Sequence, residues 1–179
     1  MRTLILYYSK TGNTQKYAED IAASLKCDVM PLKKFKKKMI ADYDTIIFGS
    51  RIMGSKIQKI DDFLSHYDAM EGKNVIVFAV GMSVVTAQTR KDLISANILD
   101  LYHLRFYQLR GSFEYDKLSF WEKFLMNQSL RRIAAMEDAS ADQKFLLTIT
   151  ENPIIYYDNQ GVDKIISVVR RLETEVPTA

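Results

Sequence analysis

A short polar segment near the amino terminus, residues 8–15, separates an apolar stretch from a segment with helical spacing. The apolar stretch, residues 3–7, has the continuous hydrophobicity of a strand that is covered on both faces. The helical segment that follows lines one side with Tyr17, Ala18, Ile21, Ala22 and Leu25. A strand that turns directly into a helix leaves backbone N–H groups and the positive end of the helix dipole at the turn. Residues 8–15 therefore predict an anion-binding loop.

Short hydroxyl and amide side chains surround this predicted loop. They belong to Ser9, Thr11, Asn13 and Thr14. Gly12 allows the backbone to approach an anion closely or to take a positive φ. Helix capping alone also favours Ser, Thr and Asn, but so many small polar residues exceed what one cap needs. The loop has neither the Gly-x-x-x-x-Gly-Lys-Ser/Thr pattern of nucleoside triphosphate sites nor the Gly-x-Gly-x-x-Gly pattern of dinucleotide sites.

Residues 9–14 read Ser-Lys-Thr-Gly-Asn-Thr and resemble the phosphate loop of the flavodoxins. In that family the pattern Ser/Thr-x-Thr-Gly-x-Thr wraps the terminal phosphate of FMN, and every specified position matches here. The resemblance implies FMN as the cofactor. It also implies phosphate contacts from Ser9, Lys10, Thr11, Gly12, Asn13 and Thr14.

The composition favours one folded domain, which we expect to span residues 1–179, because 47% of the 179 residues are hydrophobic. No apolar run is long enough to cross a bilayer, and the first residues read as a strand and not as a secretory signal, so we expect a cytoplasmic protein. The lone Cys27 excludes an internal disulfide, and with His66 and His103 it forms no metal-binding pattern.

The net charge of +3 is slight, and five lysines lie together in residues 33–38. A solvated surface segment is the first interpretation of this run, followed by attraction to an anionic membrane or an acidic partner. We expect no nucleic-acid binding. Electron-carrying flavodoxins are typically acidic, so this charge is not typical of that group.

Strands and helices alternate along the chain. Further strands are expected at residues 27–32, 45–49, 75–80 and 104–111. One helix is expected to bury Ile57, Ile60, Phe63 and Leu64, and the closing helix is expected at about residues 162–173. The alternation predicts an α/β fold with a doubly wound, five-stranded parallel sheet and helices on both faces. The flavodoxin strand order, 2-1-3-4-5, is the expected one.

Ligands of such sheets lie beyond the carboxyl ends of the strands, where the strand order reverses. The turns after Tyr8, Gly49 and Gly81 meet there, so we expect a flavin ring between the second turn, residues 50–56, and the third, residues 81–88. The predicted ring contacts are Ser50, Arg51, Ile52, Met53, Gly54, Gly81, Met82 and Ser83.

Neither of these two turns contains an aromatic residue. Flavodoxins that carry electrons usually press aromatic rings against both faces of the flavin. An uncovered ring face makes room for a substrate and favours two-electron chemistry. Arg51 or Lys56 could stabilise negative charge, but no side chain is an obvious catalytic acid or base.

An insertion of about fifty residues, 112–160, precedes the closing helix, which is far more than such a connection needs. Residues 118–136 predict an apolar helix, on which Trp121, Phe124, Leu125, Gln128 and Arg132 fall on adjacent turns. Acidic residues follow at 137–142. The helix could pack on the sheet, form a lid over the flavin, or contact membrane lipid, where Trp, Arg and Lys are favoured.

The insertion is similar to the long loop of the menaquinone-dependent protoporphyrinogen oxidases. The likeness rests on Gly-Ser-Phe-Glu-Tyr at 111–115 and Phe-Trp-Glu-Lys-Phe-Leu-Met at 120–126, and it extends over nearly the whole chain. It implies an FMN enzyme that takes hydride equivalents from a porphyrinogen and passes electrons to a quinone, and lipid contact would place it at the inner face of the membrane. Two alternatives stay open: an electron-transfer flavodoxin serving a redox partner protein, and an interaction module without cofactor.

Overall fold

The computed structural model describes residues 1–138, 144, 146–150 and 152–175. The chain forms two compact units. The first consists of Met1–Arg110 with Asp158–Ala179, and the second of Gly111–Tyr157. The expected insertion, 112–160, covers nearly the same residues as the second unit.

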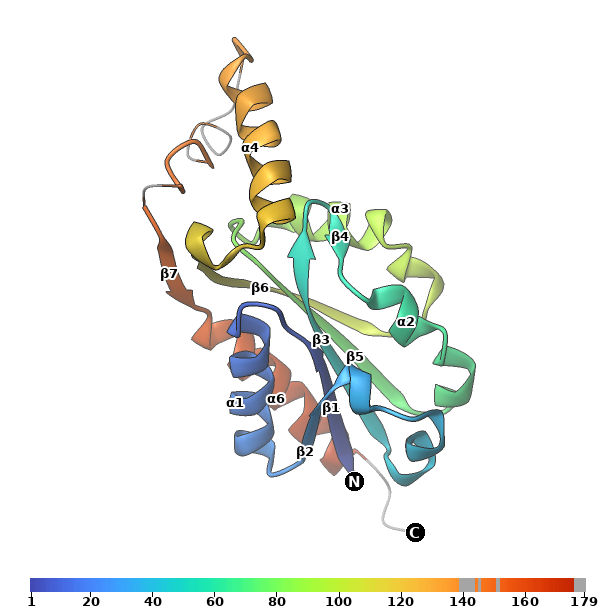
Figure 1. Ribbon diagram of the computed structural model, residues 1–179. Helices are drawn as coiled ribbons and strands as arrows, with labels where there is room; N and C mark the ends of the chain where they lie inside the picture. The colour runs from blue at the N-terminus through green and yellow to red at the C-terminus, as the bar shows by residue number, and fades with distance from the viewer. Residues whose placement is uncertain (139–143, 145, 151, 176–179) are drawn as a thin grey trace. The chain divides into compact units, whose positions relative to one another are not determined.

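A parallel sheet forms the middle of the first unit (Figure 1). Its strands are β1 (Thr3–Tyr8), β2 (Asp28–Pro31), β3 (Thr45–Met53), β5 (Asn74–Gly81) and β6 (Arg105–Phe113). They lie in the order β2-β1-β3-β5-β6, and all neighbours in this order are parallel. This is the 2-1-3-4-5 order, so the prediction of a doubly wound α/β sheet is confirmed.

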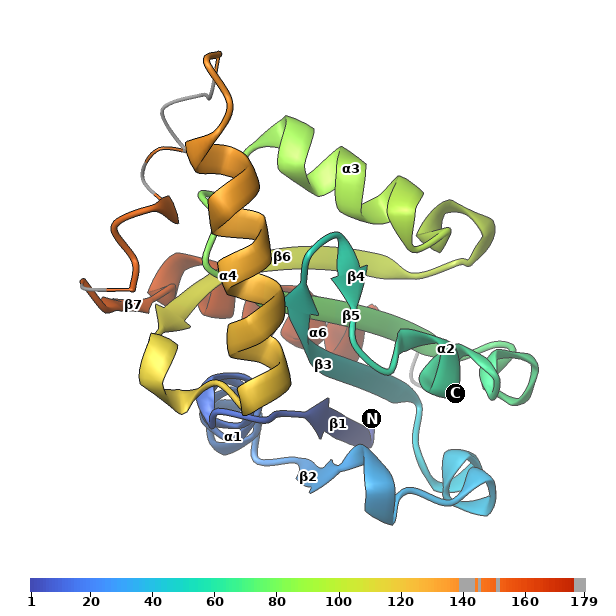
Figure 2. The same cartoon turned by 45° about the horizontal axis from the view of Figure 1, so that its top comes forward.

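Helices cover both faces of this sheet (Figures 1 and 2). On one face α1 (Asn13–Leu25) packs against α6 (Asn159–Thr174), while α2 (Ile60–Leu64) and α3 (Ala87–Ala96) lie on the other. Successive strand residues point to opposite faces, so each central strand contributes to two cores. Leu4, Phe48 and Phe63 belong to the core on the α2 and α3 side. Burial on both faces explains why these strands read as continuous apolar runs.

The end of β3 differs from its prediction. The strand continues to Met53, and Ile57 lies in the short strand β4 (Lys56–Ile57), which pairs antiparallel with the end of β3. The prediction of Ile57 as a helix residue is therefore wrong. Asn97 explains the difference, because its side chain accepts a hydrogen bond from the Ile57 N–H (2.9 Å) and donates one to the Ser55 carbonyl (2.9 Å). These bonds hold the chain as a hairpin.

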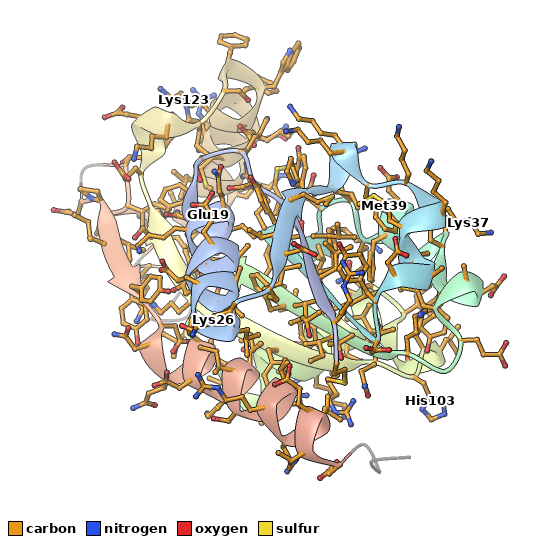
Figure 3. The ribbon with its side chains drawn as sticks, turned by 90° about the horizontal axis from the view of Figure 1, so that it is seen from below. Glu19, Lys26, Lys37, Met39, His103 and Lys123 are labelled. Carbon is orange, nitrogen blue, oxygen red and sulfur yellow. The ribbon has the colours of Figure 1, made fainter. Side chains whose placement is uncertain are left out.

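The lysine-rich segment forms two short 3-10 turns, η1 (Leu32–Lys34) and η2 (Lys37–Asp42). Its five lysines are exposed, and Figure 3 shows Lys37 pointing into solvent. Ile40 is buried, and the Phe35 ring packs edge-on against His66 at 5.5 Å between centroids. Apolar contacts thus fix the segment, and its lysines form a solvated surface. Two further 3-10 turns are η3 (Tyr67–Met70) and η4 (Leu99–Leu101).

The second unit contains η5 (Tyr115–Lys117), α4 (Phe120–Ala134) and β7 (Ile154–Tyr157). β7 pairs antiparallel with the end of β6, Gly111 facing Tyr157, and was not predicted. The helix expected at 118–136 is present as α4, with slightly narrower bounds. Of the acidic residues at 137–142, those at 139–142 lie outside the described residues. No helix in the described part of the chain is long and apolar enough to cross a membrane.

Candidate functional site

The carboxyl ends of the parallel strands lie in register at one edge of the sheet. Tyr8 of β1 pairs with Ser50 of β3, and Gly81 of β5 pairs with Arg110 of β6. Between these pairs, Arg51 of β3 faces Val80 of β5. The loop after β1, the hairpin after β3 and the turn after β5 therefore start from the same edge, as the predicted site requires.

The loop after β1 is closed by its own serine. The Ser9 hydroxyl accepts a hydrogen bond from the Gly12 N–H at 3.2 Å. Gly12 is the N-cap of α1 and has φ +91°, which glycine adopts far more readily than other residues. A Cβ atom placed on Gly12 would have no protein atom within 4 Å. The backbone beside Gly12 is therefore open to close approach by a ligand.

The first turn of α1 has no capping side chain and no acidic residue. Each of the other described helices of ten or more residues has such a group. At α3 the Thr86 hydroxyl accepts from the Thr89 N–H, at α4 the Glu122 carboxylate accepts from the Ser119 N–H, and at α6 the Asp158 carboxylate accepts from the Gly161 N–H. The positive end of the α1 dipole is thus left for another anion.

The side chains of this loop suit a phosphate. Ser9, Thr11 and Asn13 are half-buried, Thr14 is buried, and Lys10 is exposed. Together they offer hydroxyl and amide donors with one nearby cation, which is the donor set that binds a phosphate at a helix start.

The second predicted segment is mostly strand. Ser50 is fully buried in β3, where its hydroxyl donates to the Gln58 carbonyl at 2.5 Å. Arg51 and Ile52 are half-buried in the same strand. Met53 is 39% exposed and precedes Gly54 at the tip of the hairpin. The hairpin tip, and not Ser50, is therefore the exposed part of this segment.

Lys56 is hydrogen-bonded to α3, because its ammonium donates to the Ala96 carbonyl at the end of that helix (2.5 Å).

The third predicted segment packs against the second. A Cβ atom on Gly81 would lie 2.9 Å from Cδ1 of Ile52, so glycine permits this contact between the two segments. The Met82 carbonyl accepts a hydrogen bond from Nε of Arg110 at 3.3 Å. Ser83 is exposed, and Val84 and Val85 after it are 49% and 40% exposed. With Met53, they give this edge exposed apolar side chains.

Three residues at this edge were missed by the sequence analysis. The Tyr17 hydroxyl donates to the Arg110 carbonyl (2.6 Å) and accepts from the Asp158 N–H (2.6 Å). The second carboxylate oxygen of Asp158 accepts weakly from the Arg110 N–H at 3.5 Å. We call these three residues the clasp. The available signal was a tyrosine on the buried stripe of α1, because a buried phenol needs a hydrogen-bond partner.

Two titratable groups near the loop have shifted pKa values. Burial, and then the negative charge of Glu19, raises the pKa of Tyr7. The hydrogen bond that the Lys59 ammonium donates to the Asp62 carboxylate, together with the charge of Asp62, raises the pKa of Lys59, and the charge of Tyr8 raises it further. Tyr7 stays neutral and Lys59 charged at neutral pH, so neither acts as a proton donor and acceptor there.

A model of the flavodoxin domain matches residues 4–142, which is most of the chain. The chain belongs to the flavodoxin-domain family. FMN, predicted from the phosphate loop, is the cofactor of flavodoxins, and the donor set at the start of α1 fits its phosphate.

Individual relatives match shorter stretches. A flavodoxin of Maridesulfovibrio salexigens is 38% identical over 98 residues, covering 48% of this chain and 66% of the relative. An uncharacterized protein of Methanocaldococcus jannaschii is 35% identical over 95 residues, covering 52% of this chain and 63% of the relative. The chain thus matches just under two thirds of each relative's length. Among solved structures, oxidised flavodoxin 1 of Bacillus cereus matches with a TM-score of 0.47 at 15% identity, covering 98% of this chain and 99% of that one.

Proposed function

We propose that this flavodoxin-domain protein uses FMN to pass electrons between a flat hydrophobic substrate and a quinone. The observation that carries FMN binding is the uncapped start of α1, with Gly12 at φ +91° and open space beside it. Bound FMN would supply the redox chemistry, and the protein would supply binding, orientation and electrostatics.

The phosphate contacts in this proposal come from the loop between β1 and α1. Thr11, Asn13 and Thr14 would donate side-chain hydrogen bonds and Gly12 would allow close approach, while Ser9 already holds the loop closed. Lys10 is exposed and would add a positive charge near the phosphate. A dianion at this helix start would replace the capping group that the sequence omits.

The ring contacts in this proposal come from the hairpin tip and the turn after β5. Met53 and Gly54 would lie on one side and Gly81, Met82 and Ser83 on the other. Arg51 and Ile52 would support the hairpin, and Ser50 would brace it through Gln58. The exposed Met53, Val84 and Val85 would cover apolar parts of the ring, Met53 through its polarizable thioether.

The proposed substrate class is based on the residue types in these segments. Residues 50–56 and 81–86 contain no aromatic side chain, so no ring from them would cover the flavin. An open flavin face leaves room for a flat hydrophobic molecule such as a quinone or a porphyrinogen. This supports two-electron transfer between such partners, in line with the resemblance to the protoporphyrinogen oxidases.

Anaerobic reduction of the purified, FMN-loaded protein tests this proposal. We expect reduction in a single two-electron stage, reduction by protoporphyrinogen, and rapid reoxidation by menadione. Met53→Tyr places an aromatic ring at the hairpin tip. This variant should be reduced in two separate one-electron stages, and its reoxidation by menadione should be slower. Leu101→Tyr is the matched control, because Leu101 is 75% exposed and lies at the end of η4, before the amino end of β6.

An electron carrier for a protein partner is the second candidate, supported by the sequence match to a flavodoxin. Two well-separated one-electron stages, fast exchange with a flavodoxin reductase and no reaction with quinones would favour it. Purified protein that is colourless and takes up no FMN would instead favour the interaction module and would contradict both redox functions.

A further inference from the structure

The second unit exposes an aromatic helix face. On α4, Phe120, Trp121 and Phe124 are 77%, 70% and 53% exposed, and Leu125 is 48% exposed. The Trp121 ring contacts the other two edge-on, with its centroid 5.8 Å from that of Phe120 and 6.2 Å from that of Phe124. At 3.6 residues per turn these four side chains share a sector of about 140°. They form one continuous apolar patch.

This patch is not the packing face of the helix. Met126, Leu130 and Ile133, which lie on the opposite side of the helix wheel, are half-buried. Glu122 is also turned away and buried, and its carboxylate accepts hydrogen bonds from the Ser119 N–H (3.0 Å) and hydroxyl (2.7 Å). The helix therefore has one face that packs and a second apolar face that remains exposed. A contiguous exposed apolar patch marks an interaction surface.

Two arginines share the exposed face. Arg131 and Arg132 lie about two to three turns beyond the aromatic residues on the same sector, and both are exposed. The only acidic residue of α4 is Glu122, which is buried on the other side. Glu137 and Asp138 follow after the end of the helix. The face thus combines aromatic side chains with positive charge and carries no negative charge of its own.

We propose that this face of α4 binds the interface of an anionic lipid bilayer. Tryptophan and phenylalanine are favoured at the depth of the headgroups, and arginine side chains reach up to lipid phosphates while their stems stay in the apolar region. The helix would lie in the plane of the membrane, with Trp121 and Phe124 inserted and Arg131 and Arg132 pairing with anionic headgroups. This contact is independent of FMN and of the redox function.

The chain offers a direct probe, because Trp121 is its single tryptophan. Full-length protein is titrated with vesicles of phosphatidylcholine mixed with phosphatidylglycerol, and with vesicles of phosphatidylcholine alone. We expect a blue shift of the Trp121 emission with the anionic vesicles, quenching by brominated lipid, and co-flotation that weakens with added salt. No shift and no flotation with anionic vesicles would overturn the proposal.

Variants separate the two components of binding. The double variant Arg131→Gln/Arg132→Gln should bind anionic vesicles about thirtyfold more weakly, since each basic residue contributes about 1 kcal/mol near an anionic surface. Phe120→Ser/Phe124→Ser should bind at least about tenfold more weakly, at any salt concentration. All four side chains are exposed, so far-UV circular dichroism should be unchanged.

Matched controls lie in the first unit. Leu101→Ser removes a leucine that is 75% exposed, and Lys36→Gln/Lys37→Gln removes two exposed lysines. Neither control should change vesicle binding. If either control lost as much vesicle binding as the α4 variants, the assignment of the membrane contact to α4 would be overturned. A blue shift that grows with protein concentration in the absence of lipid would also overturn it, because it would indicate a second copy of the chain as the partner.

Discussion

Two helices begin beside the same edge of the sheet, and their first turns are built in opposite ways. At α3, the Thr86 hydroxyl accepts from the Thr89 N–H (3.1 Å) and the Thr89 hydroxyl accepts from the Thr86 N–H (2.9 Å). At α1, the N-cap is Gly12 and no side chain of the first turn is acidic. A helix start that carries its own cap leaves fewer N–H donors for a ligand than an uncapped one does. The missing cap thus distinguishes the anion site from an ordinary turn.

The open start has a modest energetic cost. Glycine at an N-cap, in place of Ser, Thr, Asn or Asp, costs only about a few tenths of a kcal/mol. The same helix buries Tyr17, Ala18 and Ile21 almost completely, and burial of one large apolar side chain contributes roughly 1.5–3 kcal/mol. The packing of α1 therefore offsets the absent cap without any ligand. This allows the loop to be formed before FMN arrives.

The largest expected effect comes from Gly12→Val. A β-branched side chain at φ +91° is strained by about 2 kcal/mol, and its Cβ would occupy the space beside the loop that a phosphate needs. The dissociation constant for FMN, measured by fluorescence quenching, should rise at least about thirtyfold. Riboflavin, which has no phosphate, should bind almost as before.

Gly72→Val is the matched control for Gly12→Val. Gly72 has φ +75° and no atom within 4 Å of an added Cβ, but it precedes β5 at the other end of the strands. The Gly72→Val variant should lose about as much stability as Gly12→Val and keep the FMN affinity of the unmodified protein. Unchanged FMN affinity in Gly12→Val itself would contradict the loop assignment.

A negative charge introduced at the start of α1 should affect protein stability and FMN binding in opposite directions. Asn13→Asp should stabilise the FMN-free protein by about 0.3–1 kcal/mol through the helix dipole. The same charge should repel the phosphate and weaken FMN binding about tenfold. Urea unfolding and FMN titration measure the two effects, which have opposite signs. Ala87→Asp, at the first position of α3, should stabilise the protein without changing FMN binding. Weaker FMN binding in Ala87→Asp would show that any negative charge at this edge of the sheet interferes with FMN.

Removal of the α3 cap gives a smaller and different effect. Thr86→Ala should lower the free energy of unfolding by about 1 kcal/mol, because the Thr89 N–H loses its acceptor. The ratio of FMN affinity to riboflavin affinity should stay the same, since α3 holds no phosphate in this proposal. If the ratio fell as it does in Gly12→Val, the two helix starts would not differ in function.

The weakest coupling to FMN is expected at the other end of α1, where Lys26 ends the helix (Figure 3). Burial, followed by the charges of Asp28 and Glu173, raises the pKa of the Cys27 thiol to about 11. The reactive thiolate therefore forms only as the pH rises through about 11. At pH 8 a disulfide reagent should label Cys27 about a hundredfold more slowly than a free cysteine, with or without FMN. Fast labelling of folded protein at pH 8 would refute this environment.

The sequence was informative where structure depends on neighbouring residues. The β1–α1 loop could be predicted because its strand, glycine and hydroxyl residues are adjacent, and the alternation of strands and helices predicted the sheet. The β3–β4 hairpin could not, since it depends on Asn97, which lies forty residues from Ile57. Ser50 was accordingly assigned to a turn, although it is a buried strand residue bonded to Gln58. The clasp escaped prediction for the same reason, as Tyr17 and Arg110 are 93 positions apart.

The clasp also makes the second unit replaceable. The chain departs after Arg110 and returns at Asp158, and the Tyr17 hydroxyl bonds the backbone of both. No residue between these two positions takes part in those bonds. A shorter turn or a foreign sequence spliced in at this point would leave the Arg110 carbonyl and the Asp158 N–H in place as partners of the Tyr17 hydroxyl. Arg110 and Asp158 are therefore suitable end points for an insertion, and the same sheet can carry different segments between them.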